Sequence, residues 1–256
     1  MKKFKSLLAL ALAAVLIFAA MPMPSHAADV VASGDCGRFG DVLTWTLDSE
    51  GTLTIDGEGA MQDAPGGIAP WRTYTDDIRT VIIGDGVTAI GEQMFYACNN
   101  LTSVVVGSGV TTIYNSAFIH SFRMTSITFR GNSLKTISDF AFYDCAGLTE
   151  FIMPDSVETI GDSAFYACSD LTEITIPDSV TQIGNRAFMF SGLKSAVIGN
   201  GVTELGDGAF SDCFNLTSVM IGRGVTEIGA GTFQYCGLTS IKVDSRNKFI
   251  INAFFN

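Results

Sequence analysis

The stretch "LTEITIPDSVTQIGNRAFMFSG" at 171–192 decides the fold, because a closely related stretch, "LTSVMIGRGVTEIGAGTFQYCG", occupies 216–237. Each contains one key phenylalanine towards its end, and the same context recurs seven times along the chain. Successive key phenylalanines are 23, 24, 23, 23, 22 and 23 residues apart, and so regular a spacing identifies an array of structural repeats. The key phenylalanines are Phe95, Phe118, Phe142, Phe165, Phe188, Phe210 and Phe233.

The apolar residues of one unit predict how it folds. Ile174 and Ile176 are separated by one polar residue, as in a strand that buries a single face. Val180 and Ile183 bury the stretch that follows, and Ala187-Phe188 are typical of a short helical or 3₁₀ turn. A single unit has no partner for its apolar side, whereas stacked units share one continuous core. The sequence therefore predicts a β-rich solenoid of about seven to eight stacked repeats, each 22–24 residues long.

The repeat pattern L-T-x-I-x-I-P-x-S-V-T-x-I-G-x-x-A-F-x-x-C resembles the leucine-rich repeats of the BspA-like family of bacterial surface proteins. The resemblance covers 78–243, and the stretch 36–77 is similar to the lead-in that such proteins often carry. It implies a leucine-rich-repeat-like solenoid. The pattern departs from ordinary leucine-rich repeats after Ile176, where the residues that follow the strand include no asparagine. An asparagine ladder is therefore not expected.

Residues 28–77 differ from the repeats and predict an N-terminal cap. Apolar residues alternate at 43–47 and again at 53–55, and turn residues at 49–51 lie between them, which indicates a β-hairpin. An uncovered first rung would expose apolar surface and unpaired backbone groups, so we expect the hairpin to cover it. Pro70-Trp71 is expected to open a short helix that leads into the first repeat strand.

The two ends of the chain carry different signals. Residues 1–27 combine a basic start, an apolar run and small residues at 25–27, which together predict a secretory signal peptide. The repeat pattern decays after Val243, so 244–256 are interpreted as a degenerate or incomplete C-terminal repeat.

Without 1–27, the chain has 12 Lys+Arg and 26 Asp+Glu, and this balance argues against nucleic acid or an anionic membrane surface as a partner. After 1–27, no hydrophobic stretch is long enough to span a bilayer.

Five of the six cysteines stand three residues after a key phenylalanine, and serine takes this position in the other two repeats. A catalytic thiol is not repeated along a stack, whereas a small inward residue is, so we interpret these cysteines as core residues. Disulfides between neighbouring rungs are an alternative, because the expected Cα separation and export both permit them. Cys36 lies outside this series and is expected either to be exposed or to pack under the hairpin. The five are Cys98, Cys145, Cys168, Cys213 and Cys236.

No constellation of unlike catalytic residues is found at unrepeated positions, so no catalytic, cofactor-binding or metal-binding residue is assigned. His120 is the only histidine after 1–27 and is interpreted as a surface residue. The acidic, glycine-rich stretch 48–59 leaves calcium open as an alternative. Its spacing does not fit a calcium loop, and a hairpin turn uses the same residues. A non-enzymatic role therefore comes first, with an enzyme as the remote alternative.

Function is expected on the outward side of the repeat strands, where one residue per repeat lies between two buried ones. Of these eight residues, five are apolar although they face water. β-Propensity alone explains exposed branched residues, and a hydrophobic binding strip explains them equally well. A second outward row of hydroxyl residues is interrupted by Glu150 and Glu173, so repeats four and five are the expected centre of contact. The candidate partner-binding residues are Ile82, Val105, Glu150, Ile152, Glu173, Val197 and Met220.

The leading hypothesis is a secreted or cell-surface module that binds protein or mediates adhesion through the extended solenoid surface, without catalysis. The resemblance implies this role, since BspA-like proteins are associated with attachment and with binding to proteins of a host or a neighbouring cell. No cofactor is expected, and the expected partner is an extracellular protein. The alternative is a structural spacer or a fragment of a larger multidomain surface protein, which the irregular residues after Val243 favour.

Overall fold

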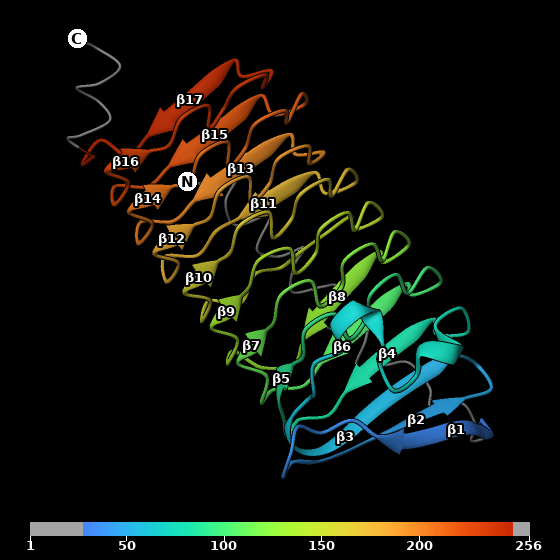
Figure 1. Cartoon of the computed structure of the whole chain (residues 1–256). Helices are drawn as coiled ribbons and strands as arrows, with labels where there is room; N and C mark the ends of the chain where they lie inside the picture. The colour runs from blue at the N-terminus through green and yellow to red at the C-terminus, as the bar shows by residue number, and fades with distance from the viewer. Residues whose placement is uncertain (1–27, 248–256) are drawn as a thin grey trace.

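The computed structural model describes residues 28–247, which form a stack of similar rungs along one axis (Figure 1). We number the rungs one to seven by their key phenylalanines, from Phe95 to Phe233. A rung consists of a front strand, which rung four lacks, a short strand after a corner, and a third side that carries the key phenylalanine. The predicted fold class, a leucine-rich-repeat-like β-solenoid, is thereby confirmed. The predicted signal peptide and 248–256 of the predicted terminal repeat lie outside the described residues.

Strands of neighbouring rungs pair in parallel, so the front side and the side of the short strands become sheets (Figure 1). The front strands are β4 (Thr80–Ile83), β6 (Ser103–Val106), β8 (Ser126–Phe129), β11 (Glu173–Thr175), β13 (Ser195–Ile198), β15 (Ser218–Ile221) and β17 (Ser240–Val243). The short strands are β5 (Val87–Ile90), β7 (Thr112–Ile113), β9 (Thr136–Ile137), β10 (Thr159–Ile160), β12 (Gln182–Ile183), β14 (Glu204–Leu205) and β16 (Glu227–Ile228).

The N-terminal strands continue the stack and then turn antiparallel. β3 (Thr52–Ala60) pairs in parallel with β4 through its first half and with β5 through its second half, so it acts as a bent rung. β2 (Val42–Asp48) forms the expected hairpin with β3, and β1 (Val30–Asp35) pairs antiparallel with β2. Asp48 lies in the stretch considered for calcium. Its side chain accepts hydrogen bonds from the backbone N–H groups of Glu50 and Thr52 and so closes the hairpin turn.

Two 3₁₀ helices lie between β3 and β4, namely Pro65–Gly67 and Arg72–Tyr74. The second follows Trp71, so the short helix expected there is one turn of 3₁₀ helix. The buried Trp71 ring stacks on Phe95 with centroids 5.4 Å apart, and thereby connects this segment to the first rung.

The key phenylalanines form a column through the core. Neighbouring rings are stacked with interplanar angles from 2° to 15°, and their centroids are 4.9 to 5.5 Å apart. These distances match the separation of neighbouring strands in a sheet, so the backbone pairing sets the ring spacing. The six rings from Phe95 to Phe210 are fully buried, whereas Phe233 in the last rung is only partly buried.

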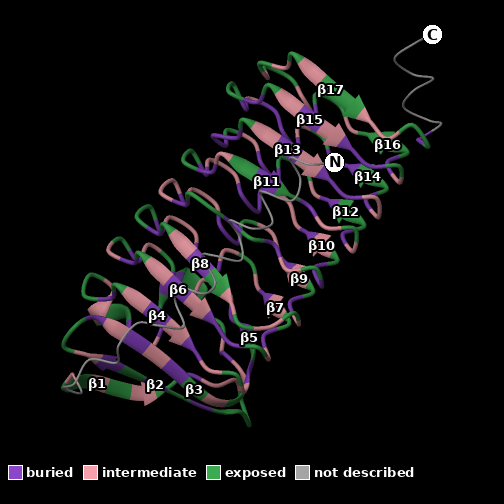
Figure 2. Cartoon of the chain, turned by 180° about the vertical axis from the view of Figure 1, so that it is seen from behind, coloured by how far each residue is buried: buried purple, intermediate pink, exposed green. Residues whose placement is uncertain are grey.

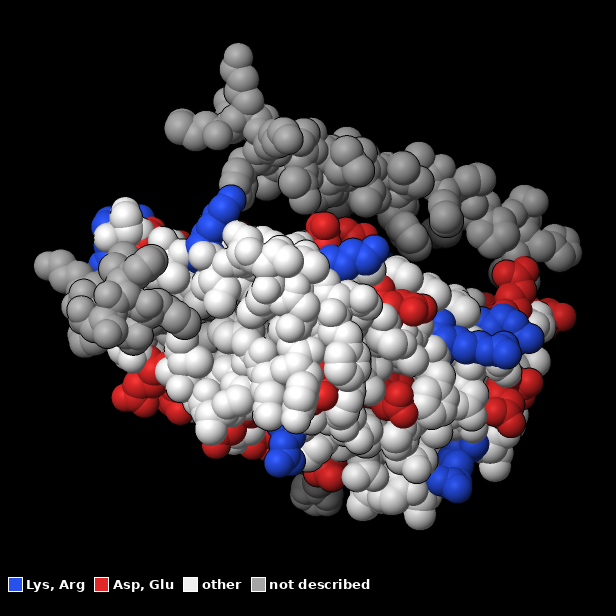
Figure 3. Space-filling view, turned by 90° about the horizontal axis from the view of Figure 1, so that it is seen from above, with Lys and Arg blue, Asp and Glu red and all other residues white. Residues whose placement is uncertain are grey.

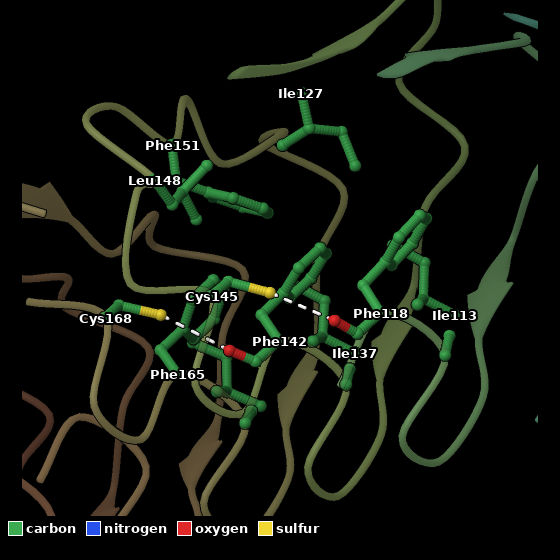
Figure 4. Packing of buried hydrophobic residues seen from close by; sticks show 14 of the residues in the cluster. Ile113, Phe118, Ile127, Ile137, Phe142, Cys145, Leu148, Phe151, Phe165 and Cys168 are labelled. Carbon is green, nitrogen blue, oxygen red and sulfur yellow. Dashed lines mark hydrogen bonds between the residues drawn. The ribbon is translucent and has the colours of Figure 1, made fainter. Parts of the chain in front are cut away.

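The repeated cysteines lie beside this column, as interpreted from the sequence. Cys145 Sγ donates to the carbonyl oxygen of Phe118 at 3.1 Å, and Cys168 Sγ donates to that of Phe142 at 3.3 Å (Figure 4). Burial raises the pKa of the Cys168 thiol far above its ordinary value, so the thiol stays protonated. All six thiols of the described residues are free. Cys36 packs in the core, where burial raises its pKa to about 12.

The third side consists of turns in which two residues per rung have a left-handed conformation. In rung one, the φ angles of Gln93 and Ala97 are 55° and 51°. The amide of Tyr96 donates to Gln93 O in a 3₁₀-type turn, whereas the amides of Phe95 and Ala97 donate to the next rung. The left-handed residues therefore aim alternate amides along the stack. Such residues are costly when they are not glycine, and the hydrogen bonds between rungs offset that cost.

Asp and Asn side chains do form ladders, so the expectation that no asparagine ladder exists was wrong in part. After the front strands, Asp178 Oδ1 accepts the backbone N–H of Asn200 at 2.7 Å, and Asn200 Oδ1 accepts that of Arg223 at 3.2 Å. A second ladder links Asp162 to Asn185 and Asn185 to Asp207 in the same way. Both ladders run through exposed turns and use aspartate as well as asparagine, so a search for one repeated asparagine does not find them.

Candidate binding face

The front face is the outer surface of the front strands, and pairing register aligns the predicted residues on it. Ile82 of β4 lies beside Val105 of β6. Val197 of β13 lies beside Met220 of β15. Buried and less buried residues alternate along most of these strands (Figure 2). The sequence pattern therefore identified the outward positions of these four strands.

Rung four interrupts the front face. The front sheet is continuous from β3 to β8 and again from β11 to β17, but 150–153 form no strand. Phe151 takes the inward position there, where the other rungs have smaller residues. Its ring packs edge-on against Phe129, Phe142 and Phe165, with centroids 5.7, 5.3 and 4.8 Å away. The bulk of this ring explains why the backbone of rung four departs from the ladder.

The predicted contact centre therefore lies at a break in the sheet. Ile152 is 48% exposed, and it follows Glu150, which keeps a single bridge to Ser126. Glu173 is exposed and pairs with Ser195 in the other part of the sheet. Among the described residues, no register joins Glu150 to Glu173. The candidates thus fall into two apolar pairs, Ile82–Val105 and Val197–Met220, with Ile152 and the two glutamates between them.

A groove of about 390 Å³ lies over β11, β13, β15 and β17, where these strands end. Val197 and Met220 line it, and Thr175 and Lys242 extend the same row on either side. Gly199 and Gly222 also line the groove, and a Cβ at either position would meet the backbone of the preceding rung. This groove was not predicted from the sequence. The available signal was the Gly-x-Gly turn after the front strands of rungs six and seven, but rungs one and two have the same turn, so it does not single out the groove.

Carboxylates border the groove. Hydrogen bonds from the backbone and the side chain of Asn200 lower the pKa of Asp178. Hydrogen bonds from the Arg246 guanidinium and backbone lower the pKa of Asp244 to about 2. Both groups are therefore ionised at neutral pH. The arrangement offers an apolar centre with acceptor oxygens at its edges, which suits an apolar side chain of a partner and a nearby hydrogen-bond donor.

The sequence matches the profile of the BspA type leucine rich repeat region over residues 73–150 and 135–256, well over half of the chain. The chain belongs to this family. A leucine-rich repeat protein from Eubacterium ventriosum is 26% identical, with a TM-score of 0.50, and the match covers 83% of this chain and 72% of that one. No curated protein gives a significant match.

Two further solved structures share the fold of this family member. The Treponema pallidum leucine-rich repeat protein has a TM-score of 0.61 at 22% identity, and the match covers 87% of this chain and 97% of that one. A leucine-rich cell surface protein from Faecalibacterium prausnitzii has a TM-score of 0.53 at 23% identity, with 84% and 78% covered. At this identity the likeness concerns the fold.

The described residues show neither a cluster of metal ligands nor a membrane-spanning helix. Within 28–247, no three histidine, cysteine, aspartate or glutamate residues are grouped so as to hold a metal ion. No helix of that stretch is both long and apolar enough to cross a membrane. Figure 3 shows one face of the molecule, where acidic and basic side chains lie around wide uncharged areas.

Proposed function

We propose that this family member is a non-catalytic module of the bacterial cell surface or the secreted space, and that it binds an extracellular protein through its front face. The predicted signal peptide at 1–27 would export it. The observation that carries the proposal is the alignment of Val197 and Met220 along a groove with ionised carboxylates at its edges. Solenoids present such extended surfaces to their partners.

The family supports a protein partner. The Faecalibacterium prausnitzii protein, which shares this fold, is described as a cell surface protein. The chain is also acidic, with 26 Asp+Glu against 15 Lys+Arg, which disfavours nucleic acid. Cys98, Cys145 and Cys168 occupy a repeated core position, and burial raises the pKa of each thiol, so these three are protonated packing residues.

The test compares two front-face variants with the natural chain. Val197→Asp with Met220→Asp places charge in the groove, and Val105→Asp with Ile152→Asp places charge on the other half of the face. Each is immobilised and exposed to a panel of purified host and neighbouring-cell extracellular proteins. For a protein that the natural chain binds, we expect at least one variant to lose affinity by about tenfold or more.

Gln182→Asp with Ser169→Asp is the matched control, because both residues are exposed and lie away from the front strands. This control should bind as the natural chain does. Melting curves must show that all variants are folded. If binding survives both front-face variants, or if the control loses it equally, the front face is not the binding site.

A structural spacer is the second candidate, because the last described rung leaves apolar residues exposed. Ile228 of β16 and Ile241 of β17 are 36% and 39% exposed, whereas Leu205 and Val219 at the same places one rung earlier are buried. A spacer would be followed by further domains, so reading the genomic DNA past Asn256 tests it. An in-frame continuation to an anchor or catalytic domain would support this role, and a stop codon would oppose it.

A further inference from the structure

Six ring side chains form an unbroken line over the third sides of rungs one to six. Neighbours along this line are in ring contact, with centroids 6.0, 5.7, 4.6, 5.5 and 6.4 Å apart in order. Phe190 is 40% exposed and Phe214 is 64% exposed, so the line lies at the surface. We call it the aromatic strip, and its members are Tyr96, His120, Tyr143, Tyr166, Phe190 and Phe214.

The strip is not a by-product of the repeat. Its rings come from three different positions relative to the key phenylalanine. Tyr166 stands one residue after Phe165, Phe190 stands two after Phe188, and Phe214 stands four after Phe210. The core of each rung does not require these surface rings, yet each makes contact with the next. A contiguous exposed apolar patch of this kind marks an interaction surface.

Carboxylates accompany the rings. Asp144 Oδ2 lies 3.2 Å from His120 Nδ1, and Asp144 directly follows Tyr143 in the chain. Burial raises the pKa of Tyr166, and the charges of Asp144 and Asp212 raise it further, while Arg186 lowers it. These two carboxylates therefore lie close enough to act on the strip electrostatically. Among the charged side chains that act on Tyr166, two are carboxylates and one is the cation Arg186, a balance that favours a positive ligand.

The molecule already shows how such a pair of groups holds a cation. The Arg38 guanidinium lies over the Tyr114 ring, 4.7 Å from its centroid. The same guanidinium donates to both oxygens of Asp63 at 2.9 and 3.1 Å. A ring and a carboxylate thus hold one arginine side chain from two directions, which combines a cation–π contact with an ion pair.

We propose that the aromatic strip binds a basic, extended polypeptide segment, whose arginine or lysine side chains contact the rings and pair with Asp144 and Asp212. This surface is separate from the front face, so the inference does not rest on the proposed function. An extended segment can follow the strip along the stack and direct every second side chain towards it. Side chains on one face of such a segment are about 6.7 Å apart and rungs are about 4.8 Å apart, so its cationic side chains meet the strip at intervals of one to two rungs.

The test measures fluorescence anisotropy of labelled octa-arginine with the 28–256 chain at about 0.15 M salt. Its neutral control is an octamer of citrulline, which has nearly the same shape without the charge. We expect octa-arginine to bind and the citrulline peptide not to bind. Phe190→Ser with Tyr166→Ser removes two rings, and Asp144→Asn with Asp212→Asn removes two charges. Each pair should weaken binding by about tenfold or more.

Asp155→Asn with Glu204→Gln is the matched control for charge, because it removes two exposed carboxylates away from the strip. It should change affinity less than about twofold. Equal weakening by both acid pairs would show that only net charge matters and would overturn the proposal, as would no binding at all. Phe190→Ser alone serves as a milder ring variant if the double variant fails to fold.

Binding of either of two other ligands to the aromatic strip would also overturn the proposal. The first is a neutral glycan: cellohexaose would then bind, and the ring variants would abolish that binding while octa-arginine affinity stayed unchanged. The second is another copy of the chain: sedimentation velocity would then show a dimer that Phe190→Ser dissociates. Binding of octa-arginine by a monomer, lost on removal of rings and of strip carboxylates but not of other carboxylates, supports the proposal.

Discussion

The thiol of Cys168 is a packing residue with one hydrogen bond, and a substitution can separate these two contributions. It is fully buried and donates to Phe142 O at 3.3 Å. Ser121 takes the same place in another rung, where its hydroxyl donates to Phe95 O at 3.0 Å. We therefore expect Cys168→Ser to keep the hydrogen bond and to lower the free energy of unfolding by about 1 kcal/mol. Urea denaturation followed by circular dichroism measures this change.

Cys168→Val is the matched variant, because valine has no donor and its second branch crowds a close-packed site. We expect it to cost about 2 kcal/mol, more than the serine variant. If valine proved less damaging than serine, apolar packing rather than the hydrogen bond to Phe142 would govern this position.

At the residue scale, the inward cysteines were predictable because they repeat, whereas the left-handed backbone conformation of other residues was not predictable. Arg186 and Phe190 have φ angles of 54° and 60°, a region that glycine normally occupies. The amide of Arg186 donates to Asp207 O at 2.9 Å in the next rung. Only the assembled stack supplies that acceptor, so one repeat read alone predicts an ordinary turn. Gly208 and Gly231 at the equivalent position were the available hint.

The free-energy cost of removing a key phenylalanine should depend on where its rung lies in the stack. Phe165 is fully buried and stacks on both Phe142 and Phe188 with centroids 5.1 Å apart. We expect Phe165→Ala to lower the free energy of unfolding by about 4 kcal/mol, because it opens a cavity and removes three ring contacts, those with Phe142, Phe188 and Phe151.

The matched variant is Phe233→Ala in the last rung. Phe233 is partly buried and has one stacking neighbour in the column, Phe210, at 5.5 Å. We expect a cost of about 2 kcal/mol, since less apolar surface is lost and only one rung contact is affected. Chemical denaturation of both variants measures the difference. Equal costs would contradict a stack in which each rung is stabilised by its two neighbours.

At the element scale, the sequence predicted most strands and missed one interruption. The hairpin and the first repeat strand, Thr80–Ile83, follow from alternation of apolar residues. Rung four has the same alternation, so it too reads as a strand. Phe151 counts there as one more apolar residue, and its size matters only once Phe129, Phe142 and Phe165 are placed around it. The candidate residues Ile82 and Val105, and likewise Val197 and Met220, lie in register within each part of the sheet, but no register crosses this break.

At the scale of the whole molecule, a stack of rungs must cover its open ends. β3 pairs with both β4 and β5, and the antiparallel strands β2 and β1 follow it at that end. We propose that 28–77 act as the cap of the array at 78–243, since antiparallel pairing ends the parallel ladder there. The open end was predictable from the repeats alone. The bent course of β3 was not, because its two halves read as one strand.

The break in rung four should divide the front sheet into two parts that hydrogen exchange can distinguish. Amides of β6 and β13 lie in paired strands, whereas 150–153 keep only the bridge between Ser126 and Glu150. We expect amides at 151–153 to exchange at least about tenfold faster than those of β6 and β13, as measured by mass spectrometry of short peptides. The control is β10 of the same rung, which pairs with both β9 and β12 and should exchange slowly. Fast exchange of β10 as well would mean that the whole rung opens, and slow exchange at 151–153 would mean that the front sheet is continuous in solution.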